Sequence, residues 1–305
     1  MGAGHRHGPH DGALAFRGRL LVVLALTAAV LVAQVVGGLL SGSLALLADA
    51  GHMLTDVAGL TVSLLAMQIA ARPATPEKTF GYLRAEVLAA SANAALLLGV
   101  AVWVVVEAVR RLREPPEVAS GVMLAVALVG LAVNAVGLLL LHSGQQQGLH
   151  LRGAYLEVLG DLVGSAAVIA AALVIGATGF TLADPIASLV IVALIVPRAL
   201  ALLREAVDVL LEATPKGMDL GEVRRHMVEL PHVRDVHDLH VWSLGTSAPV
   251  LSAHVVVDNS CFLDGHAPQL IDELQACLAG HFDVEHSTFQ LEPASHADHE
   301  HATHH

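Results

Sequence analysis

The sequence predicts an all-α membrane domain of six transmembrane helices, followed by a small α+β (αββαβ) domain exposed to water. The chain is 55% hydrophobic and only 14% charged, whereas soluble proteins carry about a quarter of their residues as charge. Six apolar segments each reach the length of about 20 residues that a helix needs to cross a bilayer. Residues 207–305 hold 16 acidic and 4 basic residues, while residues 1–206 hold 12 of each. The last third of the chain is therefore a separate, acidic domain.

We expect four parts along the chain. Residues 1–16 form a His-rich N-terminus, and residues 17–206 form the six-helix transmembrane domain. Residues 207–293 form the αββαβ domain, and residues 294–305 form a tail with five histidines. We expect both ends to be disordered. Short His-rich tracts commonly bind metal ions, but without a fold they bind them only weakly.

The six predicted spans follow one another with short links. Nine Lys or Arg residues gather near the span ends on one side, and three gather on the other. The excess of positive charge places both termini in the cytoplasm. Asp184-Pro185 at the start of the sixth span predicts the N-cap of that helix. The approximate spans are 20–40, 44–71, 83–109, 118–141, 154–175 and 182–203.

The acidic domain has the pattern of helices and strands in the order α-β-β-α-β. Helical periodicity covers residues 220–230 and 268–280. Strand patterns cover residues 237–243, 250–257 and 287–292. These elements predict a small open sheet backed by helices, on the cytosolic side of the membrane.

Several functions are disfavoured by the composition. The acidic balance argues against nucleic-acid binding, because that affinity comes mainly from basic side chains on phosphates. The two cysteines, Cys261 and Cys277, form no CxxC pair, and this scarcity fits a reduced, cytosolic setting. No nucleophile elbow, phosphate loop or HExxH motif occurs, so we do not expect an enzyme.

Two apolar spans each carry a pair of metal-ligand side chains four residues apart. His52 pairs with Asp56, and Glu157 pairs with Asp161. Residues at this spacing lie on one face of a helix, and ionisable groups at membrane depth mark ion paths more often than not. One imidazole and three carboxylates suit tetrahedral Zn²⁺, with other first-row divalent ions as alternatives. The competing interpretation is a polar patch that joins helices.

The charge of these four residues indicates what such a site would exchange. Three carboxylates give a formal charge of −3, so an empty site attracts protons, and metal binding releases them because ligands coordinate in deprotonated form. The same residues can thus exchange a divalent cation for H⁺, as in an antiporter. Asp49, three residues before His52, is a candidate proton relay or a candidate hydrogen-bond partner of the ligands.

Histidines in the αββαβ domain suggest a second metal site. His237 and His240 lie on its first strand, and His254 lies on the second. Because alternate residues of a strand share a face, His237 and His240 should point oppositely, and at most one can join His254. His286 precedes the last strand and Glu292 ends it. A regulatory metal site and ordinary core or surface histidines are both open interpretations.

Five motifs in order resemble a known family. The sequence is similar to the cation diffusion facilitators, in particular their zinc-transporting branch, over about residues 17–293. This resemblance implies six transmembrane helices, a cytosolic αββαβ domain, a homodimer, and export of Zn²⁺ from the cytoplasm against inward H⁺. The motifs are Ala48–Asp56, Thr79–Glu86, Val158–Ser165, Asp184-Pro185, and His237–Trp242 with Ser252–His254.

The family's transport ligands carry over to His52, Asp56 and Asp161. The fourth falls on Glu157, where zinc-selective members usually have His, and oxygen in place of nitrogen should soften the preference for Zn²⁺ and admit Co²⁺, Cd²⁺, Mn²⁺ or Ni²⁺. The resemblance also implies a Zn²⁺ site in the cytosolic domain, with no organic cofactor. Its ligands carry over to His240, His254, His286 and Glu292.

The leading hypothesis is a divalent metal/proton antiporter in the lipid bilayer of a bacterial inner membrane. The runner-up is a membrane-anchored metal-binding or sensing protein that does not transport. A transporter that prefers Co²⁺, Cd²⁺ or Mn²⁺ and a proton-independent channel are further alternatives. Metal flux that depends on a proton gradient would separate the antiporter from the sensing protein and from the channel.

Overall fold

The computed structural model divides the chain into two compact units. The first unit is Met1–Val62 with Ala92–Leu203, and the second is Ser63–Ser91 with Arg204–His305. The residues that the structure describes are 9–70, 72–142, 149–245, 249–284 and 286–297.

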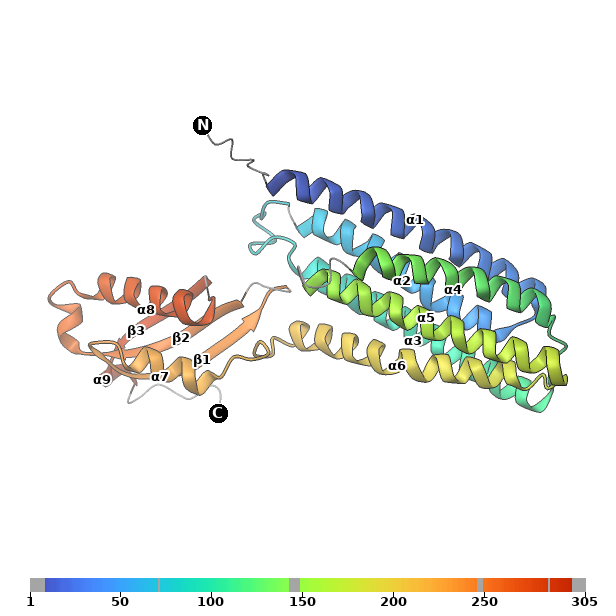
Figure 1. Ribbon diagram of the computed structural model, residues 1–305. Helices are drawn as coiled ribbons and strands as arrows, with labels where there is room; N and C mark the ends of the chain where they lie inside the picture. Colours follow the sequence, from blue (N-terminus) through green and yellow to red (C-terminus); the bar gives the residue numbers. More distant parts are fainter. Residues whose placement is uncertain (1–8, 71, 143–148, 246–248, 285, 298–305) are drawn as a thin grey trace, which may run out of the picture. The chain divides into compact units, whose positions relative to one another are not determined.

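Long apolar helices make up the first half of the fold, as the sequence predicts (Figure 1). Of the described residues, those in α3, Ser120–Leu139 of α4, Leu159–Thr178 of α5 and α6 are long and apolar enough to cross a membrane, and Ala25–Ser41 of α1 is a shorter apolar helix. These bounds match a helical transmembrane domain. The helices are α1 (Pro9–Ser41), α2 (Leu44–Ala70), α3 (Arg84–Arg113), α4 (Ser120–His142), α5 (Leu149–Thr178) and α6 (Ala183–Leu210).

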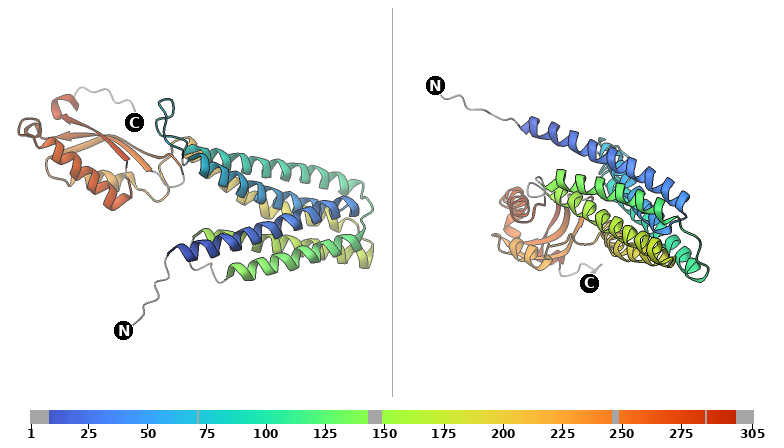
Figure 2. Two further views of the ribbon diagram at one scale, coloured as in Figure 1. Left: turned by 90° about the horizontal axis from the view of Figure 1, so that it is seen from above. Right: turned by 45° about the vertical axis from the view of Figure 1, so that its right-hand side comes forward.

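Within the first unit, α4 packs between α1 and α5 (Figure 2). Its core is built from small and branched apolar side chains, among them Leu44, Val104, Val168 and Ile191, which are at most 2% exposed. Many alanines at the core positions let these helices approach closely, as membrane helices do when small residues line their interface. The polar residues of α2 and α5 therefore lie inside a tightly packed bundle.

Asp184 is a cap, but of a different helix from the one predicted. It lies in the first turn of α6, yet its fully buried carboxylate accepts hydrogen bonds from the Ser43 hydroxyl (2.6 Å) and from the backbone N–H groups of Leu44 (2.8 Å) and Ala45 (3.1 Å). These are the unpaired donors at the start of α2. The expectation of an N-cap for its own helix was wrong, because the carboxylate is used to fix α2.

The second unit contains the α+β domain in the predicted order. The sheet has the order β1-β2-β3, with β2 antiparallel to β1 and parallel to β3. Asp219 caps α7 by accepting a hydrogen bond from the Gly221 N–H, and Asp283 ends α8 in the left-handed conformation. The elements are α7 (Leu220–Val228), β1 (Val233–Ser243), β2 (Pro249–Val257), the 3₁₀ helix η1 (Asn259–Phe262), α8 (Ala267–Phe282), β3 (His286–Pro293) and α9 (Ala294–Ala297).

The core of this domain lies between one face of the sheet and helices α7 and α8. Leu251, Ala253 and Val255 of β2 pack with Met227 of α7 and Leu274 of α8. Alternate residues of a strand face opposite sides, so His254 lies on the other face of the sheet. That second face carries the candidate ligands.

A β-bulge in β1 changes the faces predicted for its histidines. His237 pairs with His254 and His240 pairs with Ser252, so three steps along β1 match two along β2. The extra residue coincides with Asp238, whose φ of 48° is left-handed. His237 and His240 therefore lie on the same face of the sheet, and the prediction that they point oppositely was wrong.

The beginning of the His-rich tail is ordered in the structure. Residues Ala294–Ala297 form the short helix α9, which follows β3 directly and contacts β2 and β3. The expectation of disorder from residue 294 was therefore wrong for these four residues. Residues 9–16 of the N-terminus lie in α1, so the expectation of disorder was wrong for them as well. The rest of the tail and residues 1–8 lie outside the described residues.

Candidate metal centres

Three of the four ligands predicted in the membrane domain converge between α2 and α5. The His52 Nε2 atom lies 3.6 Å from Asp56 Oδ2 and 3.6 Å from Asp161 Oδ1. Two ligands that share one tetrahedral Zn²⁺ at about 2.0–2.1 Å are roughly 3.3 Å apart by geometry. Ligand atoms of all three residues lie within 4.8 Å of one another, so small side-chain rotations would bring them onto one ion.

Burying this cluster costs free energy unless a positive charge is buried with it. The side chains of His52, Asp56 and Asp161 are 10%, 19% and 7% exposed. Two carboxylates this close and this buried repel each other, and removing them from water costs several kcal/mol each. A divalent cation or bound protons would offset that cost.

Glu157 completes the predicted set by its position in the helix. It lies on α5 one turn before Asp161, so the helix directs both residues to the same face. Its side chain lies outside the described residues, and its role as the fourth ligand stays a prediction.

Asp49 is buried in the same bundle, one turn before the candidate ligand His52 on α2. Its Oδ2 atom accepts a hydrogen bond of 2.6 Å from the Gln34 side chain of α1, and it is only 1% exposed. A Cβ atom at Gly164 of α5 would lie 2.7 Å from Asp49 Oδ1, so the absence of a side chain there makes room for the carboxylate. Asp49 thus links α1, α2 and α5 next to His52.

A second cluster lies on the sheet face that α7 and α8 leave uncovered. His237, His254 and Glu292 offer ligand atoms that all lie within 4.8 Å of one another. The His237 Nε2 atom donates a hydrogen bond of 2.5 Å to Glu292, and His254 Nδ1 lies 3.8 Å from the same carboxylate. Neighbouring strands thus bring one ligand each to a single point.

Glu292 is the most buried member of this cluster, at 1% exposure. Burial works to raise the pKa of its carboxyl, but hydrogen bonds from His237 and Gln290 hold that pKa below its ordinary value. The carboxylate is therefore ionised at neutral pH, the form that binds a metal ion.

The structure groups the predicted ligands of this domain differently from the resemblance. His254 and Glu292 are in the cluster, whereas His240 Nε2 lies 3.0 Å from Asp238, whose other oxygen is 3.9 Å from His254. His286 begins β3, is exposed, and packs edge-on against the ring of Phe80. The ligand roles of His240 and His286 stay predictions. The Asp238 carboxylate lies between His240 and His254 of the cluster.

Sequence reasoning missed two residues of this region. His237 was assigned to the wrong side of the strand relative to His240, because the bulge at Asp238 leaves no clear sign in the sequence. His296 on α9 places Nε2 within 3.9 Å of Glu292, and its placement in the tail concealed it. The i,i+4 spacing from Glu292 to His296 was the available signal.

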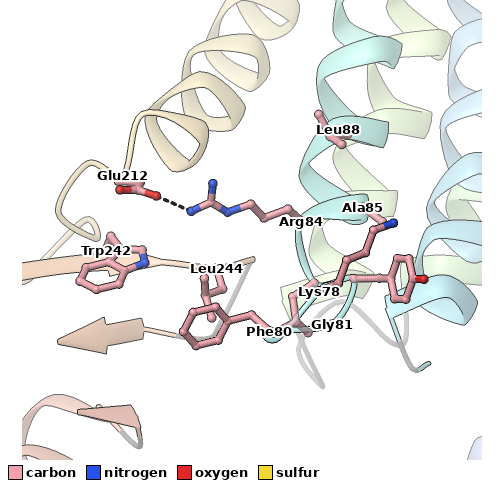
Figure 3. Close-up of a pocket in the computed structure, with 11 residues that line it drawn as sticks. Lys78, Phe80, Gly81, Arg84, Ala85, Leu88, Glu212, Trp242 and Leu244 are labelled. Carbon is pink, nitrogen blue, oxygen red and sulfur yellow. Dashed lines mark hydrogen bonds and ion pairs between the residues drawn. The ribbon is translucent and has the colours of Figure 1, made fainter. Parts of the chain in front are cut away.

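The second unit also contains a mostly apolar pocket of about 420 Å³. Residues 78–85 border it, together with Trp242 and Leu244 of the β1 end. Figure 3 shows Arg84 extending to Glu212, with 2.6 Å between guanidinium nitrogen and carboxylate oxygen, near the side chains of Phe80 and Leu244. No group of potential metal ligands was found at this pocket among the described residues.

Two family models match this arrangement of a helical unit and an α+β domain. The model of the cation efflux transmembrane domain matches residues 20–211. The model of the cytoplasmic domain of cation efflux proteins matches residues 215–294. The chain belongs to the cation efflux family. The predicted family is thereby confirmed, as is the prediction of a transporter rather than an enzyme.

Relatives match over nearly the whole chain. The zinc transporter ZitB of Escherichia coli is 46% identical over 276 residues, which cover 90% of this chain and 87% of the relative. The metal cation efflux system protein CzcD of Cupriavidus metallidurans is 43% identical over 300 residues, covering 98% and 93%. A cadmium, cobalt and zinc/H⁺-K⁺ antiporter of Bacillus velezensis is 35% identical, covering 96% and 93%. This member of the cation efflux family is an integral membrane protein with a cytoplasmic C-terminal domain.

Proposed function

We propose that this cation efflux protein exports Zn²⁺ from the cytoplasm in exchange for protons, by alternating access. The observation that carries the proposal is the convergence of His52, Asp56 and Asp161 inside apolar helices. Relatives named as a zinc transporter and as a cadmium, cobalt and zinc/H⁺-K⁺ antiporter support the choice of ion and of counter-ion.

The coupling follows from the charge of the site. With Glu157, the site holds three carboxylates and one imidazole. A Zn²⁺ ion requires the imidazole and the carboxylates to be deprotonated, and the empty, buried site takes up protons to limit its negative charge. His52 and Glu157 carry most of the exchanged protons, while Asp56 and Asp161 carry the fixed charge.

Glu157 is the residue that sets the breadth of metal selectivity in this proposal. An oxygen ligand in place of nitrogen makes the site harder, and harder sites discriminate less sharply in favour of Zn²⁺. We therefore expect measurable transport of Co²⁺ beside Zn²⁺, in accord with cobalt among the metals named for the Bacillus relative.

The cytoplasmic domain binds the same ion in this proposal. His237, His254 and Glu292 supply the ligands nearest to one another, with His240 and His296 close by. The protein acts as a homodimer, with both termini in the cytoplasm and its helices in the lipid of the bacterial cell membrane. The bacterial sources of the relatives support that location.

Transport into proteoliposomes with an imposed pH gradient tests the proposal. Purified protein should accumulate ⁶⁵Zn²⁺ when the lumen is acidic, and collapsing the gradient with a protonophore should stop the accumulation. Asp161→Asn keeps the side-chain shape and should abolish uptake, whereas Asp219→Asn at the exposed N-cap of α7 should not. Uptake indifferent to the gradient would indicate a channel, and binding without uptake would indicate a sensor.

A further inference from the structure

A third group of potential ligands lies on the helical layer of the cytoplasmic domain. His226 comes from α7, and Cys277 and His281 come from α8. Their ligand atoms all lie within 4.8 Å of one another. The sheet-face cluster lies on the opposite side of the sheet, so the two groups are separate.

These residues lie at the edge of the interface between α7 and α8. Met227 and Leu278 are fully buried in the domain core, and each directly follows one of the candidate ligands, His226 and Cys277. The ligands are therefore carried by helices whose positions are fixed by packing. Cys277 and His281 are four residues apart, so they lie on the same face of α8.

The hydrogen bonding of His281 leaves one ring nitrogen ready for a metal ion. Its Nδ1 atom donates to the backbone carbonyl of Cys277 over 3.0 Å. In metal sites the ligating histidine almost always donates its other ring N–H to a carbonyl or carboxylate. The lone pair of Nε2 is thereby available, and the His226 ring lies edge-on at 4.9 Å between ring centroids.

We propose that His226, Cys277 and His281 form a second metal site of the cytoplasmic domain, for a thiophilic divalent cation such as Zn²⁺ or Cd²⁺. One thiolate and two imidazoles are the ligand types that these ions prefer. Ligands on a single tetrahedral Zn²⁺ lie roughly 3.3–3.6 Å apart by geometry, which is within reach of side-chain rotation. Water takes the fourth position, and the bound ion ties α7 to α8. This goes beyond the proposed transport and does not depend on it.

Cadmium binding to the full-length protein in detergent tests this site. A cadmium–thiolate bond gives an ultraviolet charge-transfer band. The candidate sites around His52 and around His237 contain no cysteine, so cadmium bound there gives no such band. The wild type and Cys261→Ser should both show the band. Cys261 is the matched control because it is the other cysteine of the chain and lies buried elsewhere in the domain.

The variants of the site give the decisive results. Cys277→Ser should lose the band, and His226→Ala and His281→Ala should each weaken cadmium binding at least tenfold. Asp161→Asn should keep the band, which separates this site from transport. No band in the wild type, a band in Cys277→Ser, or unchanged affinity in both histidine variants would overturn the proposal.

A measurement on the unaltered protein guards against variants that fail to fold. Zn²⁺ should slow the alkylation of Cys277 by a thiol reagent at least tenfold, as followed by mass spectrometry. An unchanged rate at saturating Zn²⁺ would overturn the proposal in the same way.

Discussion

The buried carboxylate of Asp184 gives a strong prediction for the stability of the membrane unit. It accepts hydrogen bonds from one hydroxyl and two backbone N–H groups at the start of α2, and it is fully buried. An Arg111 guanidinium nitrogen lies 3.7 Å away as its counter-charge. Asp184→Ala would leave two backbone donors unpaired, and Arg111 would keep only its ion pair with Glu107, at 3.0 Å.

The expected loss of stability is several kcal/mol. Each buried donor left without a partner costs about 1–3 kcal/mol, so the two backbone groups give roughly 2–6 kcal/mol before the effect on Arg111. We expect at least about 3 kcal/mol. Asp219→Ala is the matched control, because Asp219 makes the same kind of cap in an exposed position, where loss of the cap costs about 1 kcal/mol.

Unfolding in mixed micelles by titration with dodecyl sulfate measures both values. The chain has two tryptophans, Trp103 in α3 and Trp242 in β1. In a Trp242→Phe background, Trp103 fluorescence reports the first unit, and in Trp103→Phe the remaining tryptophan reports the second. If Asp184→Ala destabilises the first unit no more than Asp219→Ala destabilises the second, the Asp184 carboxylate does not stabilise the start of α2 as proposed.

Three further predictions concern transport and pH. Asp161→Asn should lower zinc flux at least about 100-fold, because even the outer partners of metal ligands contribute 10–100-fold to affinity; residual flux near the wild-type rate would exclude Asp161 as a ligand. Glu157→His should raise the ratio of Zn²⁺ to Co²⁺ transport in competition assays, and an unchanged ratio would show that position 157 does not set selectivity. Hydrogen bonding to Arg234 holds the pKa of Asp258 below its ordinary value, so its stabilising effect is present at neutral pH and is lost as the pH falls below about 4. Thermal unfolding of the domain should therefore lose less stability on acidification in Asp258→Asn than in the wild type, and equal acid sensitivity would count against this pair.

The helical spans and the positions of the candidate membrane ligands were predictable because their signals are local. Apolar length identifies the helices, and the i,i+4 spacing within α2 places His52 and Asp56 on one face. That α2 and α5 meet is a tertiary fact, which the resemblance supplied and the periodicity did not. The order α-β-β-α-β was likewise readable from alternation and helical periodicity.

The predictions that were wrong concern contacts between residues distant in the sequence. The bulge at Asp238 shifts the face of His240, and nothing in the alternating pattern of the strand announces the extra residue. Asp184 caps a helix that begins 140 residues earlier, so local N-cap rules assign it to the wrong partner. The group of His226 with Cys277 and His281 arises only when α7 packs on α8.

We propose that His52, Asp56, Glu157 and Asp161 hold the transported ion. A structure of the full-length protein loaded with Zn²⁺, with the ion located by its anomalous scattering, tests this proposal most directly. We expect a peak about 2.0–2.2 Å from His52 and the carboxylates of Asp56 and Asp161, and loss of that peak in Asp161→Asn. Zinc bound only in the cytoplasmic domain, in protein that still transports, would contradict it.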